Sequence, residues 1–252
     1  MYKNEMQYAK MYLLGTMTQI LIVCLISYIL SSNSILYPKA WNTIFMIIGG
    51  TSSALWGIII SLKAKRVKSI PKLIKEFFHI KQSVLYYGMV LLFVMIIFGE
   101  QLFDFRLVDD LRWYSFFIYF VIAIVFGGIE EIGWRYTFQP LVEKKANFEI
   151  ACIVTFVSWC TWHYMYFYIT NSLHNIQHIS FIIGLLGSCF VLGAIYYISN
   201  SLWVCVLYHC LLNMFSQTML PNDLSKVIIY NIIAIIVAIF IVRFKKHQEQ
   251  TD

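Results

Sequence analysis

The amino-acid sequence predicts an all-α membrane protein with about eight transmembrane helices, and three observations lead to this fold class. Of the 252 residues, 60% are hydrophobic and only 13% are charged, whereas a soluble domain carries roughly 25% charged residues. The apolar residues gather in runs of about 17–25 residues, which lets a helix cross ~30 Å of hydrocarbon. These runs are continuously apolar, whereas the strands of a membrane β-barrel alternate between apolar and polar residues.

Eight apolar runs are the predicted spans. They cover residues 12–31, 40–62, 83–99, 114–140, 148–169, 179–199, 201–219 and 225–244. We interpret residues 1–252 as a single helical membrane domain, and the sequence contains no internal repeat. No small-x-small cleavage site follows the first run, so we expect a retained helix rather than a signal peptide.

The basic residues predict the orientation of the spans. The net charge is +6, but Lys and Arg stand between the apolar runs and do not form a nucleic-acid footprint. If the N-terminus is cytoplasmic, fourteen of the 19 basic residues fall in cytoplasmic segments and four in outer loops. This is the bias of the positive-inside rule. We therefore expect both termini in the cytoplasm, the lipid bilayer as a partner and no nucleic acid.

One stretch, residues 63–82, is strongly basic. It also carries the apolar residues Ile70, Leu73, Ile74, Phe77 and Phe78. This mixture predicts a short helix that lies on anionic lipid. The alternative is a solvated segment that only fixes the topology.

Ionisable side chains inside three predicted spans mark a candidate functional site. The fourth span carries Glu130, Glu131 and Arg135, the fifth carries His163, and the seventh carries His209. On insertion scales an ionisable group at a helix centre costs about 2.5–3.5 kcal/mol. A functional site is therefore the first interpretation of these residues, and a structural ion pair is the alternative.

The fourth span contains two acids and one base. Glu131 and Arg135 are four residues apart, share a helix face and can neutralise each other. This pairing leaves Glu130 without a dedicated cation, and a lone carboxyl group in a low-dielectric site suits general base and acid chemistry. Gly127, Gly128 and Gly133 leave room for close backbone approach, either to a neighbouring helix or to a substrate strand.

The fifth and seventh spans add matching polar faces. Trp159 and His163 are four residues apart, and so are His209 and Asn213. Hydrolysis of an amide by water needs a base for the water, donors for the oxyanion and an acid for the leaving amine. A glutamate can supply the first and third roles, while imidazole and carboxamide N–H groups can supply the second.

The same groups leave a metal site open. Glu130, His163 and His209 can bind zinc together with one water molecule, as in catalytic zinc sites. The HExxH spacing is absent, so the spacing does not decide whether a metal binds. The six cysteines all lie in apolar runs without CxxC spacing, which predicts free thiols rather than disulfides.

Taken together, these motifs resemble those of the CPBP (also called ABI) family of intramembrane proteases. That family includes the Ras-converting CAAX endopeptidases and bacterial proteins linked to bacteriocin processing or self-immunity. The resemblance covers roughly residues 114–220 and also agrees with the helix count of the CAAX endopeptidase fold. The residues that carry it are Glu130, Glu131, Arg135, Trp159, His163, His209 and Asn213.

The resemblance implies a role for each of the four polar groups. Glu130 matches the family's catalytic glutamate, which is proposed to activate water together with the residue that His163 matches. His209 and Asn213 match the pair proposed to bind the oxyanion. Both metalloprotease and metal-free glutamate mechanisms are associated with the family. We therefore assign no cofactor, with a divalent metal such as zinc as the alternative.

The remaining motif residues are implied to support this chemistry. Glu131 and Arg135 match the supporting residues of the first motif. Trp159 stands where the family usually has Phe, which keeps an aromatic wall. Tyr136 stands where the family often has Gly, and its bulk is expected to reshape the substrate cleft.

Three functions follow from these features. The first is an endopeptidase in the bacterial plasma membrane that cleaves a peptide or a lipidated protein near the bilayer surface. The second is a non-catalytic immunity or scaffold protein, which would tolerate the loss of Glu130 or His209. The third is a proton-coupled transporter, which predicts inverted repeats that the sequence lacks.

Overall fold

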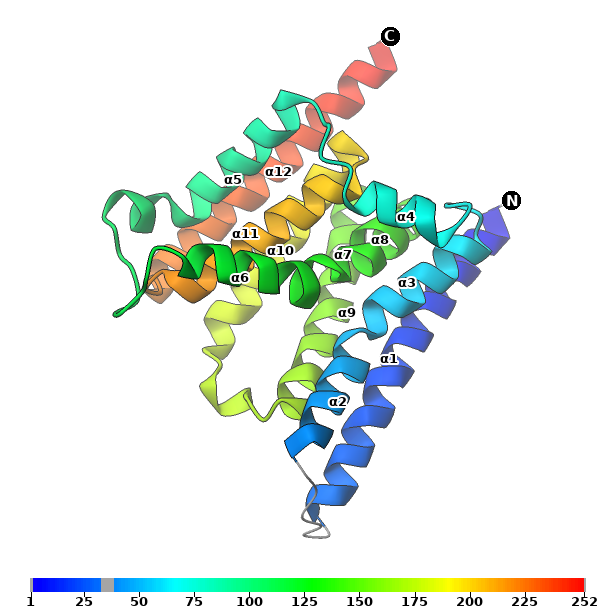
Figure 1. Cartoon of the computed structure of the whole chain (residues 1–252). Coiled ribbons are helices and arrows are strands. Elements are labelled where there is room, and N and C mark those ends of the chain that lie inside the picture. The colour runs from blue at the N-terminus through cyan, green and yellow to red at the C-terminus, as the bar shows by residue number, and fades with distance from the viewer. Residues whose placement is uncertain (1, 33–38, 252) are drawn as a thin grey trace. The chain divides into compact units, whose positions relative to one another are not determined.

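The computed structural model describes residues 2–32 and 39–251 of the chain (Figure 1). Within these ranges the secondary structure is helical, and the only β pairing is an isolated bridge between Leu107 and Met219. The all-α prediction is confirmed. The described ranges contain seven helical segments that are long and apolar enough to cross a membrane.

These seven segments correspond to seven of the eight predicted spans. They are Glu5–Leu30, Trp41–Lys63, Val84–Phe103, Ser115–Glu143, Phe148–Ile169, His178–Ser199 and Leu224–Thr251. The remaining predicted span, 201–219, is also a helix, α11 (Leu202–Thr218), but it has only 17 residues. The chain is an integral membrane protein.

The chain forms two compact units. Unit 1 comprises Met1–Lys68 and Ile132–His178, and unit 2 comprises Ser69–Glu131 and Ile179–Asp252. That residues 1–252 act as one domain stays a prediction.

Unit 1 is built around two long helices. Its elements are α1 (Tyr2–Ser32), α2 (Lys39–Gly50), α3 (Ser52–Lys63), η2 (Trp134–Phe138), α8 (Gln139–Glu143), α9 (Phe148–Ile169) and η3 (Leu173–Asn175). Helix α1 packs along α2 and α3 (Figure 1), and α9 packs against α1, α2 and α8. Buried hydroxyl groups join these helices: Trp162 Nε1 donates to Ser52 Oγ at 2.8 Å, and Tyr12 donates to Ser53 Oγ at 3.2 Å.

Unit 2 is centred on α11. Its other elements are α4 (Ile70–Phe77), α5 (Val84–Phe103), α6 (Ser115–Ala123), η1 (Ile124–Gly128), α10 (His178–Ser199) and α12 (Leu224–Thr251). Helix α11 packs against α4, α5, α6 and η1, and α5 runs beside α12 (Figure 1). Glu100 near the end of α5 binds Lys226 and Tyr230 of α12, which holds these two helices together.

Side-chain caps fix where several helices begin. Asn147 Oδ1 accepts from the backbone N–H of Ile150 at the start of α9, and Ser201 Oγ accepts from Val204 at the start of α11. These caps satisfy N–H groups that the first helical turn leaves without partners. They therefore place the two helices that carry the predicted histidines.

The fourth predicted span is not a regular α-helix. The short α7 (Glu130–Gly133), which carries both glutamates, lies between the π-helical turns η1 and η2. The backbone N–H of Ile129 donates to the carbonyl of Ile124, five residues back, at 3.2 Å. Such wide turns occur frequently at functional sites.

A close backbone approach in unit 1 joins α3 to the end of α7. A Cβ atom at Gly57 would lie 2.7 Å from the Cα of Gly133 and 2.8 Å from the carbonyl oxygen of Ile132. Both are backbone atoms, so no side-chain rotation relieves the overlap. A glycine is required at this position.

We expect Gly57→Ala to lower the stability of the protein by about 1–3 kcal/mol, the usual effect of overpacking. The measurement is the thermal unfolding midpoint of the purified protein in detergent. Gly88→Ala is the matched control, because a Cβ there meets no described atom within 4 Å. Equal midpoints for the two variants would contradict the close packing of α3.

Candidate active site

Four of the predicted site residues lie in unit 2. Glu130 and Glu131 lie on α7, and His209 and Asn213 lie on α11. Glu130, Glu131 and His209 are buried, with 4%, 0% and 3% of their surfaces exposed. Charged and polar groups at this depth need partners within the protein.

Glu131 holds the ring of His209. Its Oε1 atom lies 2.6 Å from His209 Nδ1. An ionised carboxylate can only accept a hydrogen bond, so the N–H at Nδ1 donates to Glu131. This bond fixes the orientation of the ring and leaves Nε2 to face the other way.

The side chains of His209 and Asn213 meet over Gly127. A Cβ atom at Gly127 would overlap with Asn213 Nδ2 and would lie 3.2 Å from His209 Nε2. The two nitrogen atoms therefore border the same small space on the surface of η1. The predicted close approach at Gly127 is found here, and the neighbouring element is α11.

In unit 1, Trp159 connects two other predicted residues. The guanidinium of Arg135 lies 4.2 Å from the centre of the Trp159 ring, and both side chains are almost completely buried. The Trp159 and His163 rings lie 5.2 Å apart, measured between centroids. Cation–π attraction to Arg135 therefore holds the ring against which His163 packs.

Tyr136, whose bulk is expected to reshape the substrate cleft, also lies in unit 1. Its side chain is buried, and the guanidinium of Arg66 lies 4.8 Å from the centre of its ring. The neighbouring Thr137 Oγ1 donates to the carbonyl of Ile132 at 2.7 Å. These contacts anchor the turn η2, and no local sequence pattern predicts them. A change in the substrate cleft stays a prediction.

The structure thus forms two groups of predicted residues. In unit 2, Glu131, His209 and Asn213 lie together beside Gly127. In unit 1, Arg135, Trp159 and His163 lie together. The union of both groups in one site stays a prediction, as does the pairing of Glu131 with Arg135.

The described residues do not assemble a metal centre. Within residues 2–32 and 39–251, no three His, Cys, Asp or Glu side chains are grouped so that they could hold a metal ion. The zinc ligand set Glu130, His163 and His209 stays a prediction. All six cysteines are free thiols, as predicted.

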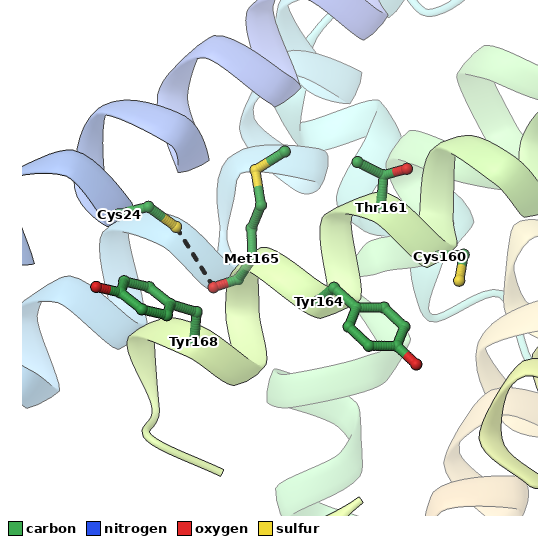
Figure 2. A pocket seen from close by; sticks show the side chains of 6 residues that line it. All are labelled: Cys24, Cys160, Thr161, Tyr164, Met165 and Tyr168. Carbon is green, nitrogen blue, oxygen red and sulfur yellow. Dashed lines mark hydrogen bonds between the residues drawn. The ribbon is translucent and has the colours of Figure 1, made fainter. Parts of the chain in front are cut away.

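A shallow groove of about 510 Å³ lies on unit 1. It is lined by Cys24 of α1 and by Cys160, Thr161, Tyr164, Met165 and Tyr168 of α9 (Figure 2). Its described lining contains no predicted catalytic residue. The thiol of Cys24 donates to the carbonyl of Met165 at 3.4 Å, which joins α1 to α9 at this groove.

The fold and these residues define an integral membrane protein with buried carboxyl and imidazole groups and a partly exposed carboxamide beside them. Residues 112–215 match the family model described as type II CAAX prenyl endopeptidase, Rce1-like. This match over 104 of the 252 residues supports the CPBP and CAAX protease family and confirms the resemblance. The match includes all seven motif residues and ends just after Asn213. No curated protein matches the chain.

The contact between Glu131 and His209 generates a prediction about stability. We expect Glu131→Gln and His209→Ala to be coupled by about 1.5–3 kcal/mol, because hydrogen bonds to charged groups contribute this much. The measurement is a double-mutant cycle on the free energy of unfolding in mixed micelles.

The control cycle combines Glu131→Gln with His247→Ala, since His247 is exposed near the end of α12. Effects of such separated sites should add to within about 0.5 kcal/mol. Additive effects for the first pair would mean that the two side chains do not interact.

Proposed function

We propose that this chain is an intramembrane endopeptidase that hydrolyses a peptide bond near the bilayer surface. At family level it is a CAAX-type intramembrane protease. The observation that carries the finer proposal is the 2.6 Å contact between Glu131 and His209, which aims His209 Nε2 at the space shared with Asn213.

His209 and Asn213 are proposed to bind the oxyanion. Acyl transfer is accelerated by N–H donors that already point to where negative charge develops. Nε2 of His209 and Nδ2 of Asn213 border one space beside Gly127, which has no side chain of its own. In this role both ring nitrogens carry protons, with Nδ1 facing Glu131 and Nε2 facing the substrate oxygen.

Glu130 is proposed to activate the water molecule, with His163 as its partner. Glu130 takes a proton from water, and the hydroxide forms a bond to the carbonyl carbon of the substrate. The C–N bond then breaks, and Glu130 returns the proton to the leaving amine. Burial of Glu130 favours this cycle because few water molecules compete for its proton.

Arg135 and Trp159 are proposed to position His163. The guanidinium holds the Trp159 ring on one side, and the imidazole packs against that ring. Neither residue needs to touch the substrate in this role. Loss of either one would misplace His163 rather than remove a proton donor or acceptor.

The substrate is proposed to be a peptide or a lipidated protein that reaches the site from the membrane. The proposed location is a bacterial plasma membrane. Both termini are proposed to lie in the cytoplasm, because the basic residues follow the positive-inside rule. Zinc is the alternative cofactor, and Glu130, His163 and His209 would then hold it. In that case zinc would polarise the carbonyl and activate the water.

The decisive experiment compares wild type with Glu130→Gln in bilayers, using a fluorogenic farnesylated CAAX peptide and N-terminal profiling of host membrane peptides. We expect cleavage to fall by about 100-fold or more, since the general base is lost. Glu249→Gln, at an exposed site near the C-terminus, is the matched control. Undiminished cleavage by Glu130→Gln would remove the assignment. Loss of cleavage with phenanthroline, restored by zinc, would instead favour the metal mechanism.

We expect Gly127→Ala to reduce cleavage by about 100-fold or more, the effect of losing one oxyanion donor. The new methyl group would displace the end of the Asn213 side chain rather than backbone, so the unfolding midpoint should stay near that of wild type. Gly184→Ala is the control, because a Cβ there meets no described atom within 4 Å. Full activity of Gly127→Ala would argue against an oxyanion site beside η1.

A further inference from the structure

Helix α4 is amphipathic, and packing within the protein covers only part of its apolar side. It begins at the cap Ser69, whose Oγ accepts from the N–H of Lys72, and runs from Ile70 to Phe77. Leu73 and Phe77 are buried, with 2% and 5% of their surfaces exposed. Helix α4 packs against α11 of the same unit.

A second apolar row on the same helix is exposed. Ile70, Ile74 and the adjoining Phe78 have 49%, 53% and 54% of their surfaces exposed. At about 3.6 residues per turn, this row lies next to the buried row around the helix. A soluble segment would not keep three large apolar side chains in a row facing water.

Basic side chains follow next around the helix. Lys75 borders the exposed apolar row, and Lys72 lies beyond it; both are exposed, and Lys72 Nζ lies 3.6 Å from the Glu76 carboxylate in an exposed i,i+4 pair. Lys81, also exposed, follows in the connection to α5. Around its axis α4 therefore presents a protein-facing row, an exposed apolar row and a basic face, which is the arrangement of helices that lie in a membrane interface.

The connection to α5 keeps this helix at the bilayer surface. Helix α5 has 20 residues, about 30 Å at 1.5 Å per residue, so both of its ends lie near the two bilayer surfaces. The residues between Phe77 and Val84 reach at most about 25 Å when fully extended. This connection is also held to α11, because Tyr87 donates to the carbonyl of Ile80 and Trp203 Nε1 donates to the Tyr87 hydroxyl at 3.1 Å.

We propose that α4 is a binding surface for anionic phospholipid. Ile70, Ile74 and Phe78 enter the boundary between headgroups and acyl chains. Lys72, Lys75 and Lys81 pair with the phosphate groups around them. The three lysines favour a ligand with negative charge. The apolar row beside them favours a lipid over a soluble anion.

The test measures hydrogen–deuterium exchange of residues 69–82 in the full-length protein. The protein is placed in two kinds of nanodisc. One contains phosphatidylcholine alone, and in the other roughly one lipid in three is the anionic phosphatidylglycerol. We expect exchange to be about tenfold slower in the anionic discs, because each basic side chain near such a surface contributes several-fold. Added salt should reduce the difference.

The matched variants separate charge at α4 from charge elsewhere. Lys72→Gln with Lys75→Gln should abolish most of the difference between the two lipids. Lys144→Gln with Lys145→Gln, a pair of exposed lysines after α8, should keep the difference. All of these side chains are exposed, so the fold is retained.

Two results would overturn the proposal. One is equal exchange of residues 69–82 in both kinds of nanodisc, which would mean a solvated segment that does not bind anionic lipid. The other is equal protection by soluble glycerophosphoglycerol in phosphatidylcholine discs, which would show an anion site that needs no membrane. The exchange measurement does not depend on peptide cleavage. It therefore tests lipid binding by α4 separately from the proposed protease activity.

Discussion

The contact between Glu131 and His209 is the constraint on which the geometry of unit 2 depends. A carboxylate and an imidazole cannot be left unpaired in a hydrocarbon-like interior, where an unsatisfied polar group costs several kcal/mol. Their 2.6 Å contact brings α7 against α11. At the same place the small Gly127 of η1 lets the side chains of Asn213 and His209 approach the backbone, and a methyl group there would displace the end of the Asn213 side chain.

Much of the fold follows from the sequence because a bilayer permits few solutions. A continuous apolar run in hydrocarbon must satisfy its backbone hydrogen bonds internally, so it forms a helix. The π-helical turns η1 and η2 were not foreseen, because the residues of Ile124–Gly128 and Trp134–Phe138 follow no pattern that distinguishes them from an α-helix. The 17-residue length of α11 reflects the cap at Ser201 and the β bridge at Met219.

The candidate site, too, could be predicted only in part. Its residue types could be named from the sequence, because buried ionisable groups are costly and the family motifs place them. The contacts that these residues make could not be predicted from the sequence. The sequence spacing suggested Arg135 as a partner for Glu131, and that pairing stays a prediction. The contact of Glu131 with His209, which is 78 residues away, has no counterpart in the local spacing. The contact between Arg135 and Trp159 likewise depends on how η2 packs against α9, and no local spacing encodes it.

The π-helical turn η1 separates an exposed apolar part of the fourth predicted span from a buried part that carries the two acids. Each π-turn holds one residue more than an α-turn, which offsets the side chains beyond it by about 100°. Phe117, Val121 and Val125 before α7 are exposed, whereas all of Glu130–Gly133 is buried. Within a few residues the chain therefore changes from an exposed apolar surface to a buried segment that carries both acids. Because of the offset, the side chains on the two sides of η1 do not continue one regular helical face.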